Sequence, residues 1–139
     1  MCKYAGSAHI KGFISTNSLK KYIRNAVKTL KEIDKLTPFD TIAFCGISGC
    51  LIGPLLAIRL KKEMIVVRKD SDNDRHSAYN VEGNADVKNY IIVDDLISSG
   101  DTMRHVKSSI TKELSKSAVC LGGFTLQERT GFLQTEWMR

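Results

Sequence analysis

The chain has 139 residues, of which 42% are hydrophobic and 26% are charged, and its formal net charge is +6 at pH 7. This composition is typical of a globular protein and excludes a disordered or low-complexity chain. No run of about 18 apolar residues occurs, so no membrane span is expected, and "MCKYAGSAHIKGF" (1–13) lacks the apolar core of a secretory signal. We therefore expect a cytoplasmic protein with one domain over residues 1–139.

Residues 18–36 ("SLKKYIRNAVKTLKEIDKL") place apolar side chains at helical spacing. They predict an amphipathic helix with Thr16 or Ser18 as its N-cap, ended by Pro38. This segment also carries much of the positive charge, on Lys20, Lys21, Arg24, Lys28 and Lys31. A solvated helix face explains these residues more simply than a stripe that binds nucleic acid.

The next segments alternate between short apolar runs and a second helix. "TIAFCGI" (41–47) predicts a buried strand, "SGCLIGPLLAIRLKK" (48–62) a glycine-containing loop that leads into a helix, and "EMIVVRK" (63–69) another strand. Pro54 is tolerated only near the start of that helix. From residue 70 to residue 88 the chain is polar and aperiodic, as in a loop that is functional or disordered.

The second half repeats the alternation. "NYIIVDD" (89–95) predicts a strand, the spacing of Met103, Val106, Ile110 and Leu114 a helix, and "SAVCLGGFTL" (117–126) a fourth strand. Strands that alternate with amphipathic helices indicate an α/β fold, with a parallel twisted sheet flanked by helices and right-handed crossovers.

The four cysteines, Cys2, Cys45, Cys50 and Cys120, are scattered along the chain. They lack the close paired spacing of a zinc site, and two of them lie in apolar stretches. We expect buried thiols rather than disulfides or a metal site.

Three polar segments follow strands of the predicted sheet: "GISG" (46–49), "RK" (68–69) and "DDLISSGDT" (94–102). Ligands of such sheets bind beyond the carboxyl ends of the strands, so these segments are expected at one edge. In "SSGDT", a turn of small residues before a helix exposes backbone N–H groups that form an anion cradle. An ordinary capped helix is the alternative for this turn taken alone.

The adjacent carboxylates of Asp94 and Asp95 favour the ligand-binding interpretation. Two neighbouring carboxylates at the end of a buried strand repel each other unless something accepts their charge. A vicinal diol offers two hydroxyl donors, and Mg²⁺ or a developing cation is stabilised beside them. A diol on the carboxylates and a phosphate on the turn together describe a ribose 5-phosphate.

The segment "YIIVDDLISSGDTM" (90–103) resembles the phosphoribosyl-diphosphate signature of the type I phosphoribosyltransferases. The resemblance implies that Asp94 and Asp95 hold the ribose hydroxyls and Mg²⁺, directly or through water, and that Asp95 is catalytic. It assigns the 5-phosphate to Ser98, Ser99, Gly100, Asp101 and Thr102. It also implies the family's fold, with a reduced hood, which is the cover over the base that these enzymes build from their chain ends.

Other segments fit the same family, whose order of elements matches residues 20–126. "GISG" resembles the loop that grips the diphosphate, with Ser48 and Gly49 as candidate binding residues, and Arg68 and Lys69 resemble the cationic pair that neutralises it. Residues 70–86 resemble a catalytic lid, which excludes water from a reactive ribosyl cation. "SAYNVEG" (77–83) is similar to the lid of the adenine enzymes, which makes Tyr79 a lid anchor and Glu82 a candidate catalytic acid/base.

The resemblance implies a transferase that displaces magnesium diphosphate from phosphoribosyl diphosphate by a nitrogenous base, with a purine, adenine above all, favoured. Residues 1–16 and 127–139 remain for the hood, where Phe13, Phe124, Phe132 or Trp137 could stack on a base, although core or interface roles are more common. The family also suggests a homodimer. The alternative is a regulator of the same fold that senses phosphoribosyl diphosphate or a nucleotide without turnover. A nucleic-acid binder is disfavoured, because no aromatic interleaving or binding motif occurs.

Overall fold

The computed structural model describes residues 5–6, 8–69, 78–126 and 132–139, and of residues 8, 9 and 11 it describes the backbone. The elements are α1 (Ala8–Ile14), α2 (Thr16–Leu36), β1 (Thr41–Cys45), α3 (Gly46–Leu60), β2 (Glu63–Val67), β3 (Val81–Gly83), β4 (Asn89–Asp94), α4 (Asp101–Glu113), β5 (Val119–Thr125) and the 3₁₀ helix η1 (Glu136–Met138). The predicted alternation of strands and helices is confirmed.

The five strands form one sheet in the order β3-β2-β1-β4-β5. The β1–β2, β1–β4 and β4–β5 pairs are parallel, and only the edge strand β3 is antiparallel to its neighbour. The predicted α/β fold with a parallel sheet is therefore confirmed. Connections leave the central β1–β4 pair in opposite directions, and such a point is where open α/β sheets bind their ligands.

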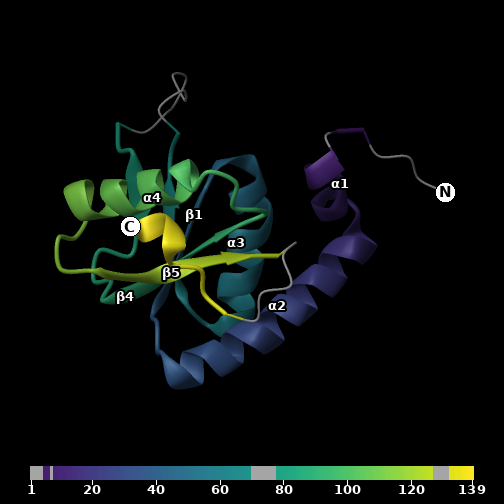
Figure 1. Cartoon of the computed structure of the whole chain (residues 1–139), viewed down its shortest axis with the longest axis horizontal. Helices are drawn as coiled ribbons and strands as arrows, with labels where there is room; N and C mark the ends of the chain where they lie inside the picture. The colour runs from purple at the N-terminus through teal and green to yellow at the C-terminus, as the bar shows by residue number, and fades with distance from the viewer. Residues whose placement is uncertain (1–4, 7, 70–77, 127–131) are drawn as a thin grey trace.

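Helices cover both faces of the sheet (Figure 1). Ile42 and Phe44 of β1 pack with α2 and α3 on one face, whereas Ala43 and Cys45 face α4 and η1 on the other. This split follows from the strand geometry, in which successive side chains point to opposite faces. Since both faces of the central strands are buried, β1 and β4 read in sequence as continuous apolar runs.

Three short elements, α1, β3 and η1, were not predicted. Helix α1 precedes α2, so that α2 begins at Thr16 after Ser15, which makes no side-chain cap hydrogen bond. Strand β3 lies in the segment that was predicted to be a loop, and it pairs Val81 with Val67. A three-residue edge strand carries too little alternation to be recognised, because its pairing partner is what holds it in the sheet.

The predicted position of Pro54 near the start of a helix is wrong. Helix α3 begins at Gly46, directly after β1, so Pro54 falls inside it. Pro54 cannot donate the intrahelical hydrogen bond to Cys50. The contacts of Ile52 and Leu56, which are fully buried in the core, outweigh that loss.

In the described part of the chain, the basic residues of α2 lie at the surface, and the prediction of buried thiols is confirmed for two cysteines and wrong for Cys50. Lys20, Lys21, Arg24, Lys28 and Lys31 are all exposed on α2. Cys45 and Cys120 are buried thiols, as predicted, whereas Cys50 is exposed, and none of the three forms a disulfide. Within the described ranges, every helix is too short or too polar to span a bilayer.

Candidate active site

A cavity of about 380 Å³ lies at the carboxyl edge of the sheet, beyond β1 and β4. Most residues predicted for the site line it, from three separate segments of the chain: Ser48, Lys69, Asp94, Asp95, Ser98, Ser99, Gly100, Asp101 and Thr102. Cys45, Leu96, Ile97 and Met103 complete its wall. The sheet thus brings "GISG", Lys69 and the 94–102 segment together, as the topology predicts.

The acidic pair is buried at the end of β4, with Asp94 8% exposed and Asp95 5% exposed. Asp94 Oδ1 accepts hydrogen bonds from the Asp95 amide (2.8 Å) and from Ser48 Oγ (3.3 Å), and Asp95 Oδ1 accepts one from the Leu96 amide (2.9 Å). Burial, together with the neighbouring Asp95, raises the pKa of Asp94 to about 7. The pair therefore favours a ligand that donates hydrogen bonds or carries positive charge.

The raised pKa predicts how stability depends on pH. Between pH 3.8 and about 7, Asp94 keeps a proton in the native state that it has lost in the unfolded chain. The contribution of Asp94 to the free energy of unfolding is therefore complete below pH 3.8 and is lost as the pH rises through about 7. The Asp94→Asn variant lacks this loss. We expect its melting temperature to match that of the wild type at pH 4 and to exceed it by roughly 5 °C at pH 8.

Thermal unfolding followed by circular dichroism at pH 4, 6 and 8 measures this difference. Asp86→Asn is the matched control, because Asp86 is exposed at the opposite end of the sheet. A difference between Asp94→Asn and wild type that stays constant with pH would contradict the assignment of this proton to Asp94.

The loop after the acidic pair turns sharply into α4. Gly100, the N-cap of α4, has φ +85°, a left-handed conformation that favours glycine. A Cβ there would lie 2.7 Å from Trp137 Cβ. Ser99 Oγ accepts a hydrogen bond from the Asp101 amide (3.3 Å). The first-turn amides of α4 and the hydroxyls of Ser98, Ser99 and Thr102 therefore form one donor-rich rim of the cavity.

The opposite rim is the first turn of α3, which the sequence predicted as a loop. Gly46 has φ +74°, so the strand turns into the helix without a connecting segment. A Cβ on Gly46 would lie 2.8 Å from Lys69 Cε and 3.2 Å from Lys69 Nζ, so the ammonium group of Lys69 lies over this turn. A helix N-terminus beside an ammonium group is a second place for an anion.

Arg68, Glu82 and Gly49 lie outside the cavity lining. Arg68 Nη2 donates to Glu82 Oε2 (2.9 Å), which turns the guanidinium toward β3, and the buried Arg68 Nε has no partner in the described part of the chain. Glu82 lies on β3 rather than in a lid loop, which corrects its predicted setting. Gly49 is buried against Phe44, because a Cβ there would lie 3.2 Å from Phe44 Cβ.

The predicted lid and hood are only partly described. The lid segment 70–77, which includes Arg75 and His76, lies outside the described residues, while Tyr79 beside it is exposed. Of the candidate stacking aromatics, three belong to the core: Phe13 is 1% exposed, Phe124 4% and Trp137 6%. Phe132 is the exposed one of the four, at 62%.

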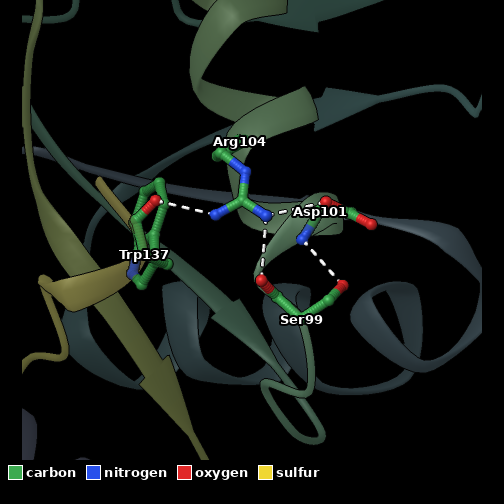
Figure 2. Close-up of polar contacts among 4 residues, drawn as sticks. All are labelled: Ser99, Asp101, Arg104 and Trp137. Atoms are coloured by element: carbon green, nitrogen blue, oxygen red, sulfur yellow. Dashed lines mark hydrogen bonds and ion pairs between the residues drawn. The ribbon is translucent and has the colours of Figure 1, made fainter. Parts of the chain in front are cut away.

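Two residues of α4 that were not predicted from the sequence, Arg104 and His105, fix the position of the donor-rich rim at residues 98–102. Arg104 donates to the carbonyls of Ser99 (2.8 Å) and Trp137 (3.0 Å) and to Asp101 Oδ1 (2.7 Å), as Figure 2 shows. His105 Nε2 lies 2.9 Å from the carbonyl oxygen of Arg68 and so ties α4 to the end of β2. The i, i+3 spacing of Asp101 and Arg104 on a predicted helix was the sequence feature that could have indicated their contact.

The donor set also fits a divalent cation of the Mg²⁺ kind. Asp94 and Asp95 are two adjacent buried carboxylates, and Mg²⁺ is usually bound by one or two carboxylates together with water and substrate phosphates. No cluster of three metal-ligating side chains occurs among the described residues. Because Asp101 is paired with Arg104, the acidic pair is the part of this cavity that suits a cation.

Comparison with known proteins gives two curated relatives. One is the transcriptional regulator GfcR of Thermoplasma acidophilum, 29% identical over 59% of this chain and 41% of the regulator. The other is an adenine phosphoribosyltransferase of Bifidobacterium longum, 32% identical over 66% of this chain and 56% of the enzyme. The chain thus spans about half the length of the curated relatives it matches. No family model matches it.

Among solved structures, the chain resembles an adenine phosphoribosyltransferase from Saccharomyces cerevisiae, with a TM-score of 0.61 and 24% identity over 80% of this chain and 68% of that one. That enzyme was crystallised with an imino-altritol bisphosphate and adenine. The likeness confirms the fold that the signature at residues 90–103 implied.

Proposed function

We propose that this chain, which has the type I phosphoribosyltransferase fold, transfers the phosphoribosyl group of phosphoribosyl diphosphate to a nitrogenous base and releases diphosphate. The observation that carries the proposal is the shared cavity, lined by an acidic pair between two anion-binding rims. Phosphoribosyl diphosphate has the matching pattern, with a diol between a phosphate and a diphosphate.

Each part of the cavity takes one part of this substrate. Ser98, Ser99, Gly100, Asp101 (through its backbone N–H) and Thr102 would donate to the 5-phosphate, and the first turn of α3 with Lys69 would bind the diphosphate. Asp94 and Asp95 would accept hydrogen bonds from the two ribose hydroxyls. Because the pKa of Asp94 is raised to about 7, this interaction strengthens above neutral pH.

The reaction is a displacement at C1 of the ribose. The bond from C1 to the diphosphate oxygen breaks, and its electron pair leaves with the diphosphate. A lone pair on a ring nitrogen of the base forms the new bond to C1, and the proton of that nitrogen passes to solvent. Positive charge develops on the ribose ring as the diphosphate leaves, and the buried carboxylates stabilise that charge electrostatically.

The proposed roles of the remaining residues follow from their settings. Lys69 neutralises charge on the leaving diphosphate, and Arg68 joins it only if the pair with Glu82 opens. The acid/base role of Glu82 requires the same opening. When bound to Asp94 and Asp95, Mg²⁺ would supply further charge neutralisation for the diphosphate. The cytoplasmic location and the homodimer stay predictions.

Adenine is the base we propose, because the curated enzyme and the solved structure that resemble this chain are adenine phosphoribosyltransferases. The test is diphosphate release by the whole chain from phosphoribosyl diphosphate and Mg²⁺ with adenine, hypoxanthine, guanine or orotate. We expect adenine to be used at least about 10-fold faster than orotate. Absence of release with every base would contradict the proposed transfer.

A second candidate is a regulator that binds phosphoribosyl diphosphate or a nucleotide without turnover. It is favoured by one observation, the 29% identity to a transcriptional regulator. The same incubation separates the two candidates if binding is measured beside release. Saturable binding of phosphoribosyl diphosphate with no diphosphate formed would favour the regulator.

A further inference from the structure

The guanidinium of Arg104 connects residues 98–102, called the phosphate-binding loop below, to helix η1, which lies outside the cavity lining. It donates to the carbonyl of Ser99, to Asp101 Oδ1 and to the carbonyl of Trp137 in η1 (Figure 2). Arg104 itself does not line the cavity but lines a separate groove, together with Trp137 and Lys112. Arg104 therefore contacts the loop but does not line the cavity in which a ligand would bind.

Helix η1 is anchored to the sheet. Gly123 of β5 and Gln134 exchange two backbone hydrogen bonds, of 2.8 and 2.9 Å, and Trp137 Nε1 donates to the carbonyl of Gln134 at 2.7 Å. The Trp137 side chain is buried, and its Cβ lies against Gly100. A continuous path of contacts thus runs from β5 through Gln134, Trp137 and Arg104 to the loop.

The contact with Ser99 fixes the direction of a backbone donor. The C=O and N–H groups of a trans peptide point in opposite directions, and the Ser99–Gly100 peptide is trans. Since the Ser99 carbonyl accepts a hydrogen bond from Arg104, the Gly100 N–H of the same peptide points away from Arg104. The positive φ of Gly100 permits this arrangement.

Arg104 also neutralises the acid in the loop. Asp101 lines the cavity, and its carboxylate would repel a phosphate. Its hydrogen bond with Arg104 is the main reason why the pKa of Asp101 lies below its usual range, so this carboxylate is ionised at neutral pH. The guanidinium of Arg104, which does not line the cavity, supplies the compensating charge.

We infer that Arg104 is a positioning residue for the 5-phosphate, and that η1 braces the phosphate-binding loop through it. The inference rests on the proposed function, because it assumes that the loop binds the 5-phosphate. It adds that phosphate affinity depends on a contact with η1, outside the cavity. Because the Arg104 side chain is 45% exposed, its loss leaves the core intact.

The test compares the Kd of ribose 5-phosphate with the Kd of inorganic diphosphate, which probes the opposite rim, by isothermal titration calorimetry of the whole chain. We expect Arg104→Ala to raise the ribose 5-phosphate Kd at least about 10-fold and the diphosphate Kd less than about 2-fold. Arg104→Lys keeps the charge but not the fork of donors, and should fall in between.

Lys112→Ala is the matched control, since it removes one positive charge from the same helix and the same groove without touching the loop. It should change the ribose 5-phosphate Kd less than about 2-fold, since an exposed charge this far away is largely screened. Equal ribose 5-phosphate Kd values for wild type and Arg104→Ala would overturn the positioning role of Arg104 but not the proposed function. An equal loss of ribose 5-phosphate affinity in Arg104→Ala and Lys112→Ala would do the same. If the wild type binds neither ligand, the proposed function fails and the brace fails with it.

Discussion

Replacing Asp95 by asparagine is expected to lower kcat for phosphoribosyl transfer at least about 100-fold, a typical cost of removing one preorganised electrostatic group. The change removes the charge that is proposed to stabilise the ribosyl cation, while the size and shape of the side chain are kept. The asparagine Oδ1 can still accept the Leu96 amide that Asp95 Oδ1 accepts at 2.9 Å. Because the variant is isosteric, its circular dichroism spectrum should match that of the wild type, and its melting temperature should not fall, since the change removes one charge from a buried carboxylate pair. The measurement is the initial rate of diphosphate release at saturating substrate.

Asp86→Asn makes the same chemical change at an exposed position remote from the cavity, and it should keep the wild-type rate. If Asp95→Asn turns over as fast as Asp86→Asn, the acidic pair does not carry the electrostatic role assigned to it.

A large loss of stability is expected for Gly53→Ala. Gly53 lies inside α3 where the helix crosses Phe44 of β1, and a Cβ there would lie 2.5 Å from Cγ of the ring and 2.8 Å from Cε1. Alanine gains up to about 1 kcal/mol in helix propensity over glycine. Overpacking a filled core costs typically about 1–3 kcal/mol, and here the buried ring must move. We expect the melting temperature to fall by roughly 5–10 °C in thermal unfolding.

A second substitution tests the cause of this loss. Phe44→Leu makes room for the new methyl group, so the Phe44→Leu/Gly53→Ala double variant should be more stable than the sum of the two single changes predicts. A Gly53→Ala variant as stable as wild type would mean that α3 does not need this close approach to bring Ser48 to the cavity.

The part of the candidate site whose local structure was predicted correctly is one continuous segment. The apolar run of β4, the acidic pair and the small residues up to Thr102 are contiguous, and the strand, turn and helix that they predict are the ones observed. The parallel pairing of β1, β2, β4 and β5 then follows from the alternation of strands and helices. Lys69 and Ser48 reach the same cavity because the parallel strands end at one edge.

The parts that were missed depend on contacts between distant residues. Arg68 and Lys69 are adjacent in sequence, yet Lys69 lies over Gly46 while Arg68 pairs with Glu82. The different orientations of Arg68 and Lys69 depend on β3, which carries Glu82 and is too short to show a recognisable strand pattern in the sequence. The role of Arg104 depends on a carbonyl in η1, 33 residues away, and a carbonyl leaves no mark in the sequence.

The most direct test of the ribose-phosphate site is a titration of ¹⁵N-labelled protein with ribose 5-phosphate, followed by the backbone amide resonances. We predict that the largest shift changes occur at residues 98–102 and at Asp95, with α2 unaffected and with the changes at Asp95 much reduced in the Asp95→Asn variant. Saturating shifts confined to the basic face of α2, or no shifts at residues 98–102, would contradict the assignment of this cavity to a phosphoribosyl group.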